Sequence, residues 1–296
     1  MTLPRLSPLV FGCVLLAGAV PAPADTLEKI KDAGSITLGH RESSIPFSYY
    51  DDQQRVIGYS QDIALRVVDA IKRELQLPDL QVRLNPVTSQ NRIPLIQNGT
   101  VDLECGSTTN NTERQKQVAF STTIFIVGTR LLTKKASGIQ DFSDLAGKNV
   151  VTTAGTTSER LLRKLNEDQQ LNMKIISAKD HGESFLTLET GRAAAFMMDD
   201  ALLYGELAKA KRPDDWVVVG TPQSLEAYGC VLRKDDPAFK TLVDATIAGL
   251  MTSGEAQTLY AKWFQSPIPP KGLNLNFPLS AEMVELYRNP NDRALQ

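Results

Sequence analysis

Short β-branched runs alternate with amphipathic patterns along the first third of the chain. The run Ser35–Gly39 predicts a strand, and apolar residues at helical spacing predict a helix over Ser60–Leu75. Two further strands are predicted at Leu80–Val87 and Val101–Cys105, with a short helix over Ser89–Gln97 between them. Strands that alternate with helices in this way indicate a mainly parallel sheet.

The same alternation restarts near residue 149. The predicted strands of this second unit are Asn149–Thr152, Met173–Ser177, Ala194–Met198 and Trp216–Val219, and its predicted helices are Ser158–Gln169, Glu183–Thr190 and Ala201–Lys211. Two long β-rich runs, Thr123–Lys134 and Ala227–Arg233, stand on either side of the unit. The proline-rich stretch Pro267–Pro270 predicts a loop that leads into a C-terminal tail.

Composition narrows the classes of protein that fit this pattern. The chain has 296 residues, 42% of them hydrophobic, which is enough to bury more than one core. Its formal charge of -2 and its 6% of aromatic residues disfavour binding to nucleic acid or to an anionic membrane. Two histidines and three cysteines leave little material for a metal centre. We therefore expect no metal, no cofactor and no nucleic-acid partner.

The first 24 residues have the features of a secretory signal peptide. A single charge, Arg5, precedes a short apolar run, and Ala22-Pro23-Ala24 forms a cleavage site of small residues before Asp25. The run is shorter than the roughly 20 apolar residues that span a bilayer. A lipoprotein signal at Gly12-Cys13 and an ordinary buried helix are the alternatives. The preferred interpretation is an exported, soluble protein.

Export changes the interpretation of the cysteines. Cys13 leaves with the signal peptide, and Cys105 and Cys230 remain. In an oxidising compartment these two either pair or stay as two buried thiols. If they pair, the chain leaves a first α/β unit, builds a second and returns to the first. Two crossings of this kind would make a hinge between two lobes, with a cleft between them.

Polar residues gather directly after the predicted strands of the first unit. Three such segments, residues 39–47, 88–92 and 106–114, carry Arg41, Arg92 and Arg114. Open α/β sheets place ligand sites at such strand ends, and the planar guanidinium group suits a carboxylate. A single arginine is more often a solvated surface charge, but all three follow strands. This repetition favours a binding role.

The second unit carries a matching set of polar residues. Thr156 and Glu159 have capping-box spacing before a helix, whose free N–H groups attract an anion or are simply capped. His181 lies near a strand end, where it is either structural or a ligand contact. Asp199 ends an apolar strand and could hold an ammonium group, whereas Asp200 fits the helix N-cap better. An excess of cations with one acidic partner suits an acidic amino acid.

Several longer stretches resemble a known family. They are Gly39-His40-Arg41-Glu42-Ser43-Ser44, residues 88–94, residues 104–111, Ser177-Ala178-Lys179-Asp180-His181-Gly182 and Phe196-Met197-Met198-Asp199-Asp200. On these stretches the chain resembles the periplasmic glutamate/aspartate-binding proteins of ABC importers, within the polar amino-acid-binding family. The resemblance runs from about Thr26 to the C-terminus.

The resemblance implies an α/β fold of the type II periplasmic binding protein class, two-lobed, with a hinge and a central ligand cleft. The implied divisions are a signal peptide at 1–24, the first part of lobe 1 at 25–128, lobe 2 at 129–225, and the return to lobe 1 with a tail at 226–296. It also implies a disulfide between Cys105 and Cys230, a monomer in the periplasm, and an ABC transporter permease in the inner membrane as partner.

The resemblance assigns the site residue by residue. Arg114, Ser107, Thr109 and the helix start at Thr157 would hold the α-carboxylate of L-glutamate or L-aspartate, Asp199 would hold its α-ammonium group, and Arg41, Ser89, Arg92 and His181 would surround its side-chain carboxylate. No catalytic residue and no cofactor are implied.

Two other classes of function compete with this interpretation. Related two-lobed folds host dehydratases and lytic domains, so fold alone does not exclude an enzyme, and Glu42, Glu104 or His181 could serve as acid or base. A sensory module would use the same pocket with a different partner. The cationic cluster is better explained by binding than by catalysis.

Overall fold

The computed structural model describes residues 25–295, so the predicted signal peptide lies outside the described residues. The helices are α1 (Thr26–Ala33), α2 (Tyr59–Leu75), α3 (Arg92–Gln97), α4 (Thr112–Gln115), α5 (Thr157–Asp168), α6 (His181–Glu189), α7 (Asp200–Lys209), α8 (Pro237–Thr252), α9 (Glu255–Phe264) and α10 (Ala281–Arg288), with 3₁₀ turns η1 (Lys135–Ser137), η2 (Phe142–Leu145) and η3 (Pro213–Asp215). The strands are β1 (Ser35–His40), β2 (Ser43–Ser44), β3 (Ser48–Tyr50), β4 (Val56–Ile57), β5 (Gln81–Pro86), β6 (Leu103–Glu104), β7 (Ala119–Lys134), β8 (Asn149–Thr153), β9 (Lys174–Ala178), β10 (Ala195–Asp199), β11 (Trp216–Val219), β12 (Leu225–Leu232), β13 (Pro267–Ile268) and β14 (Leu273–Asn274).

One long strand joins two sheets. The strand order is β5-β1-β6-β12-β7-β10-β8-β9, with β11 also paired to β7. The first part of β7 pairs with β12 as far as Gly128, and the second part pairs with β10 and β11 from Thr129 onward. Strands β1, β5 and β6 are parallel, as are β8, β9 and β10, whereas β7 and β12 are antiparallel to each other. The mainly parallel sheet predicted from sequence is therefore present in each part, with antiparallel strands connecting the two.

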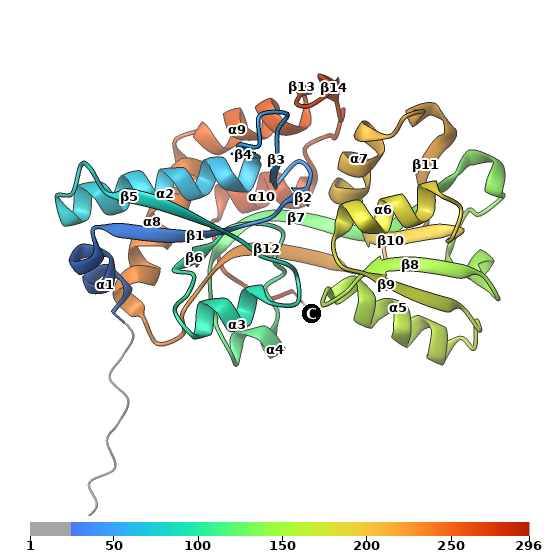
Figure 1. The fold of residues 1–296 in the computed structure, drawn as a ribbon, viewed down its shortest axis with the longest axis horizontal. Helices are drawn as coiled ribbons and strands as arrows, with labels where there is room; N and C mark the ends of the chain where they lie inside the picture. The colour runs from blue at the N-terminus through green and yellow to red at the C-terminus, as the bar shows by residue number, and fades with distance from the viewer. Residues whose placement is uncertain (1–24, 296) are drawn as a thin grey trace, which may run out of the picture.

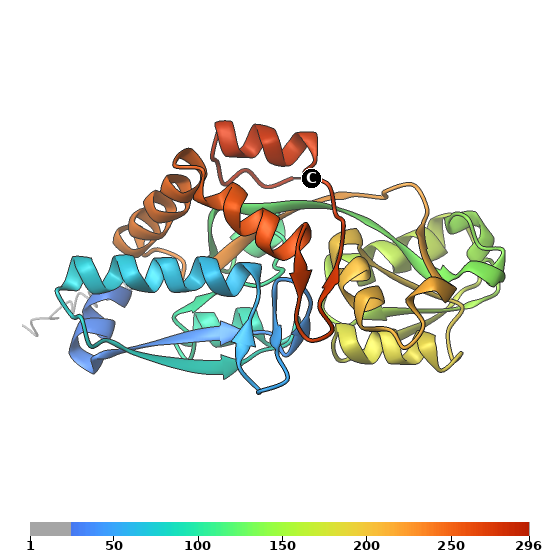
Figure 2. The ribbon, with the colours of Figure 1, turned by 90° about the horizontal axis from the view of Figure 1, so that it is seen from above.

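Each sheet has helices on both faces, which gives the molecule two α/β lobes (Figure 1). In the first lobe α2 lies above the sheet and α3 and α4 lie below it; in the second, α6 and α7 lie above and α5 lies below. Seen from above, the chain crosses between the lobes along β7 and along the segment leading into β12 (Figure 2). The two-lobed fold predicted from the sequence is confirmed.

Residue patterns explain the main elements. In α2, Ile63, Val67 and Ile71 lie one turn apart on the buried face, as a helical period requires. Strand β7 is rich in Thr, Ile, Val and Phe and is buried along almost its whole length, because helices cover both faces of the sheet. Helix α5 begins where the Thr156 side chain accepts a hydrogen bond from the N–H of Glu159.

Some boundaries differ from the sequence-based prediction. The helix expected from Ser89 begins at Arg92, because Thr88 and Asn91 close a turn through their side chains. Asp200 does not occupy the N-cap position of α7; Asp199 does, although its side chain makes no capping hydrogen bond. The stretch Pro267–Pro270 is not wholly a loop, since its first two residues form β13.

The predicted disulfide is present. Cys105 and Cys230 are bonded across a sequence separation of 125 residues, and both are buried. The alternative of two free thiols is therefore wrong. The bond links the residue directly after β6 to β12, so it ties the first segment of lobe 1 to the segment that returns after lobe 2.

Candidate functional site

Three arginines from the first lobe are buried where the lobes meet. Arg41 follows β1 and is 2% exposed, Arg92 opens α3 and is 2% exposed, and Arg114 lies in α4 and is 4% exposed. Each comes after a strand, so parallel strand ends bring them to one edge of the sheet. These are the three arginines that the sequence singled out.

The guanidinium groups have fewer protein partners than buried charges require. Arg92 Nη1 donates to the carbonyl of Ser107 at 3.2 Å, but Arg92 Nε has no partner, and neither has Arg41 Nη1. The hydroxyls of Ser89 and Ser107 are also buried without a partner. Buried polar groups are nearly always hydrogen-bonded, so this cluster is arranged to bind something with several acceptor oxygens.

The three guanidinium groups also repel one another. Burial, with the neighbouring Arg92 next in importance, lowers the pKa of Arg41 to about 10 and the pKa of Arg114 to about 9. The pKa of Arg92 is also lowered by burial. Glu104 opposes these shifts as a buried counter-charge, with Oε2 accepting from Thr108 and Oε1 unpartnered. Asp180, Asp199 and Glu226, from other segments, also act on these arginines, so the unpartnered donors, and not a simple excess of positive charge, favour binding of an anion.

Arg114 also reaches across to the second lobe. Its Nη1 donates to the carbonyl of Thr109 at 2.9 Å, and its Nη2 donates to the carbonyl of Gly155 at 3.3 Å. The hydroxyls of Thr109 and Thr157 lie 3.4 Å apart, at the first residue of α5. A helix start supplies N–H groups and a partial positive charge, which suit a carboxylate beside Arg114.

His181 contacts the first lobe from the start of α6. Its Nδ1 lies 2.9 Å from Ser44 Oγ, and the N–H of Gly182 donates to Ser43 Oγ at 3.2 Å. Burial lowers the pKa of His181 well below its usual value, and the charges of Arg41, Arg92 and Lys209 lower it further. The imidazole is therefore neutral at pH 7 and can act as a hydrogen-bond partner without adding a charge.

Hydroxyl groups surround Asp199 at the end of β10. Thr129 and Ser158 donate to Oδ1 at 3.0 Å and 3.2 Å, and Tyr228 donates to Oδ2. Burial raises the pKa of Asp199 to about 7, with the charge of Glu226 as the second cause. A cation placed beside this buried carboxylate would stabilise its ionised form.

The structure therefore gathers the predicted residues at one place. Arg41, Arg92, Ser107, Thr109, Arg114, Thr157, His181 and Asp199 are linked by the contacts and charges described above, and Ser89 lies three residues before Arg92. Sequence reasoning placed Ser44 in a polar segment but gave it no role, and it missed Tyr228; these two residues contact His181 and Asp199 respectively. Tyr228 lies in a β-rich run whose alternation gave no reason to prefer one polar side chain over another.

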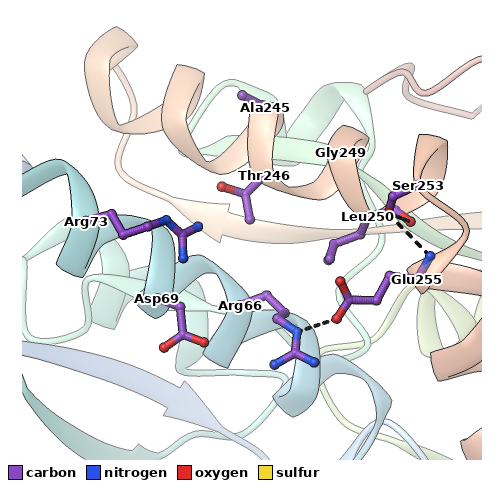
Figure 3. A pocket seen from close by; sticks show the side chains of 9 residues that line it. All are labelled: Arg66, Asp69, Arg73, Ala245, Thr246, Gly249, Leu250, Ser253 and Glu255. Atoms are coloured by element: carbon purple, nitrogen blue, oxygen red, sulfur yellow. Dashed lines mark hydrogen bonds and ion pairs between the residues drawn. The ribbon is translucent and has the colours of Figure 1, made fainter.

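A separate hollow of about 590 Å³ lies between α2 and α8 (Figure 3). Its charged side chains balance, since Arg66 and Arg73 face Asp69 and Glu255, and Arg66 pairs with Glu255 at 2.5 Å. It belongs to the first lobe alone and includes none of the predicted site residues. The arginine cluster between the lobes, not this hollow, has the buried, unpartnered donors of an anion site.

Neither a metal centre nor a membrane span is found in residues 25–295. Within this range no three His, Cys, Asp or Glu residues are grouped so that they could hold a metal ion. No helix in the same range is both long and apolar enough to cross a bilayer.

Two α/β lobes joined by a pair of β crossings, with polar side chains buried between them, define a ligand-binding protein of the type II periplasmic class. The sequence agrees, because the profile of the bacterial extracellular solute-binding proteins, family 3, matches residues 36–266. The chain belongs to this family.

Similar proteins include curated relatives of high identity. A glutamate/aspartate import solute-binding protein of Escherichia coli is 68% identical over 277 residues, covering 94% of this chain and 92% of the relative. An L-glutamate/L-aspartate-binding protein of Pseudomonas aeruginosa is 63% identical over 299 residues, covering 99% of each. Relatives at this identity are solute-binding proteins and not enzymes, so the enzyme alternative is not supported.

Solved structures agree on the fold. A mutant of the arginine-binding protein of T. maritima superposes with a TM-score of 0.72 at 27% identity, covering 81% of this chain and 99% of that one. An ancestral amino-acid-binding protein, described as a precursor of cyclohexadienyl dehydratase, superposes with a TM-score of 0.69 at 28% identity, covering 81% and 99%.

Proposed function

We propose that this protein captures L-glutamate or L-aspartate outside the cytoplasm and delivers it to the permease of an ABC importer in the inner membrane. The relatives at 63% and 68% identity carry names with these two ligands. The observation that carries the proposal for this chain is the set of buried, unpartnered donors on Arg41, Arg92, Ser89 and Ser107. An acidic amino acid supplies two carboxylates for such donors and one ammonium group.

Each part of the ligand has a matching part of the site. We assign the α-carboxylate to Arg114, Ser107, Thr109 and the N-terminus of α5 at Thr157, the α-ammonium group to Asp199, and the side-chain carboxylate to Arg41, Ser89, Arg92 and His181. A guanidinium group binds both oxygens of a carboxylate at once, which a neutral amide cannot match in charge. The buried cations would therefore reject glutamine, because one charge would remain without a counter-charge.

Closure of the lobes is the proposed mechanism of capture. The proposed lobe 1 comprises residues 25–128 and 226–296, and lobe 2 comprises residues 129–225, with the hinge where β7 changes partners and the chain returns. Arginines of lobe 1 would bind the ligand first, and His181, Asp199 and Thr157 of lobe 2 would then complete the site. The ligand shifts the equilibrium toward closure only by its higher affinity for the closed form.

Lys271 is a further contact across the proposed lobes. Its ammonium group donates to the carbonyls of Lys209 at 2.6 Å and Ala210 at 2.9 Å, at the C-terminal end of α7. A cation there complements the partial negative charge of the helix end. The hairpin β13–β14 carries Lys271 beside α7, far along the chain from the ligand residues, and would favour the closed arrangement.

The signal-peptide pattern of residues 1–24 supports a periplasmic location for the protein. Cleavage after Ala24 would release residues 25–296 into the periplasm as a monomer, in keeping with a family of extracellular proteins. Direct sequencing of the N-terminus of the secreted protein would test the cleavage site.

Calorimetric titration of ligand-stripped mature protein tests the ligand. L-glutamate and L-aspartate are expected to bind at submicromolar concentration, and L-glutamine at least about 100-fold more weakly, or roughly 2.7 kcal/mol. Arg114→Gln should abolish binding of all three, whereas Arg73→Gln, an exposed arginine on α2, should change nothing. Absence of heat with both acids, or equal affinity for glutamine, would contradict the proposal.

A further inference from the structure

Four side chains, those of Asp199, Thr129, Ser224 and Glu226, form a hydrogen-bond network along the connection between the lobes. Thr129 Oγ1 lies 3.0 Å from Asp199 Oδ1 and 2.8 Å from Ser224 Oγ, and Ser224 Oγ lies 2.7 Å from Glu226 Oε1. Backbone pairing holds this network in place. Asp199 pairs with Thr129 between β10 and β7, and the N–H of Thr129 donates to the carbonyl of Ser224 at 3.2 Å.

The network has three oxygen–oxygen contacts, but its two hydroxyl groups supply only two protons. An ionised carboxylate only accepts hydrogen bonds, and each hydroxyl carries a single proton. With Asp199 and Glu226 both ionised, the three oxygen–oxygen contacts would share two protons, and one pair of oxygens would meet without a hydrogen between them. All three contacts have hydrogen-bond length. A third proton, on one of the two carboxyl groups, gives each of the three contacts a hydrogen.

The surroundings of Asp199 favour this extra proton. Asp199 is 3% exposed, so its carboxyl group is separated from water, and the carboxyl group of Glu226, itself 5% exposed, lies close to it. These two effects together raise the pKa of Asp199 to about 7. The charged and titratable groups that face the pair are Arg92 on α3, Arg114 on α4, Asp200 on α7 and Tyr228 on β12.

We propose that Asp199 and Glu226 hold one shared proton through Thr129 and Ser224, and that the α-ammonium group of the ligand expels it. The inference rests on the proposed function, because it requires an ammonium group at Asp199. When that group binds, its N–H donates to Asp199, both carboxyl groups are ionised, and the proton passes to solvent past Ser224, which is only partly buried. One of the three contacts then loses its hydrogen. Glu226 is a positioning residue, because it acts on Asp199 and does not touch the ligand.

Proton release distinguishes this role from a merely structural one. L-glutamate is titrated calorimetrically at pH 6, 7 and 8 in buffers with different enthalpies of ionisation, and the dependence of the observed heat on the buffer gives the number of protons released. We expect up to one proton per ligand, with more released at pH 6 than at pH 8. The association constant should accordingly rise with pH, by at most about tenfold per pH unit. Glu226→Gln should lower the release and flatten this pH dependence while binding is retained.

The control is Glu282→Gln, an exposed glutamate on α10, which should release protons as the unmodified protein does. Equal release by the unmodified protein and Glu226→Gln would overturn the inference. Any contribution of His181 is common to both proteins and cancels in the comparison. If Glu226→Gln does not fold, Ser224→Ala provides a second test, because it interrupts the hydrogen-bond network and keeps both carboxyl groups. Unchanged proton release in that variant would also overturn the inference. Failure of the unmodified protein to bind L-glutamate would instead contradict the proposed function.

Discussion

Arg41 is expected to have opposite effects on ligand binding and on closure of the lobes. Its guanidinium group is buried between the lobes with Nη1 unpartnered, so bringing the lobes together removes water from a charge that no protein acceptor replaces. The same donor is available to a carboxylate of the ligand. We therefore expect Arg41 to oppose closure of the lobes without ligand and to favour closure with it.

Arg41→Met tests this opposition at the level of one residue. The variant keeps an unbranched side chain but removes the charge, so the ligand-free protein should shift toward the closed form and show a smaller radius of gyration by small-angle X-ray scattering. Affinity for L-glutamate should fall at least about 30-fold, equivalent to roughly 2 kcal/mol, because a buried charge pair is lost. Arg73→Met is the exposed control. Lost affinity with unchanged scattering would show that Arg41 does not oppose closure.

At the scale of an element, α7 carries a buried carboxylate that its own helix only partly neutralises. Glu206 is fully buried, and Lys209 Nζ lies 2.6 Å from Oε2, yet neither carboxylate oxygen has a well-aligned hydrogen bond. Burial raises the pKa of Glu206 to about 7 against the opposing charge of Lys209, and Asp180 adds to the rise. The folded protein therefore binds a proton here that the unfolded chain releases near pH 4.5.

This proton makes stability depend on pH. Because the folded pKa lies above the unfolded one, the contribution is fully present below pH 4.5 and is lost as pH rises through 7. Glu206→Gln does not titrate, so its unfolding free energy relative to the unmodified protein should improve by roughly 1–3 kcal/mol between pH 5 and pH 8. Urea unfolding at both pH values, with saturating ligand to keep the lobes together, measures the difference.

Glu167→Gln provides the control for this experiment, since Glu167 is exposed near the end of α5. It should show no change in relative stability between the two pH values. A Glu206→Gln variant whose relative stability is the same at pH 5 and pH 8 would refute the role assigned to the buried carboxylate.

At the scale of the whole molecule, the disulfide closes a loop that contains the entire second lobe. It joins Cys105 to Cys230, at a separation of 125 residues, within the first lobe. Constraint of so long a loop in the unfolded chain stabilises the fold by about 4–5 kcal/mol in the chain-entropy model, although measured values for native disulfides run from about 2 kcal/mol.

The double variant Cys105→Ala/Cys230→Ala should therefore lose roughly 2–5 kcal/mol of unfolding free energy, measured by urea denaturation. Reduced unmodified protein should lose a similar amount, which separates loss of the bond from the effect of alanine. A loss of less than about 1 kcal/mol in both would mean that the return of the chain to lobe 1 is secured by packing and strand pairing, without help from the bridge.

Local patterns predicted most elements of both lobes but few of the C-terminal ones. The strands around the arginines and the helix α2 have clear periodicity, and their predicted limits agree with the structure to within a few residues. Helices α8, α9 and α10 were not predicted. Helix α8 packs on α2, β7, α9 and α10 and is apolar on several sides, so its sequence lacks a simple amphipathic pattern. Helix α10 does bury one face, with Met283, Leu286 and Tyr287, and its pattern was overlooked.

In the candidate site, too, some residues could be predicted from the sequence and others could not. Position after a strand is a local property, so the sequence alone indicated Arg41, Arg92, Arg114 and Asp199 as residues at sheet edges. Which hydroxyl groups reach Asp199, and that Glu226 lies close enough to raise its pKa, depend on the pairing of β7 with β10 and β12. Those neighbours come from segments far apart in the chain, and no local pattern specifies their approach.

The sequence by itself determined the class of fold, the pairing partners available to cysteine and the placing of three arginines directly after strands. The tertiary structure decided which charges are buried, and hence the directions of the pKa shifts at His181, Asp199 and Glu206. The physical reason is that residue type sets the charge a group can carry, whereas removal of water and the distance to other charges set the free energy of carrying it.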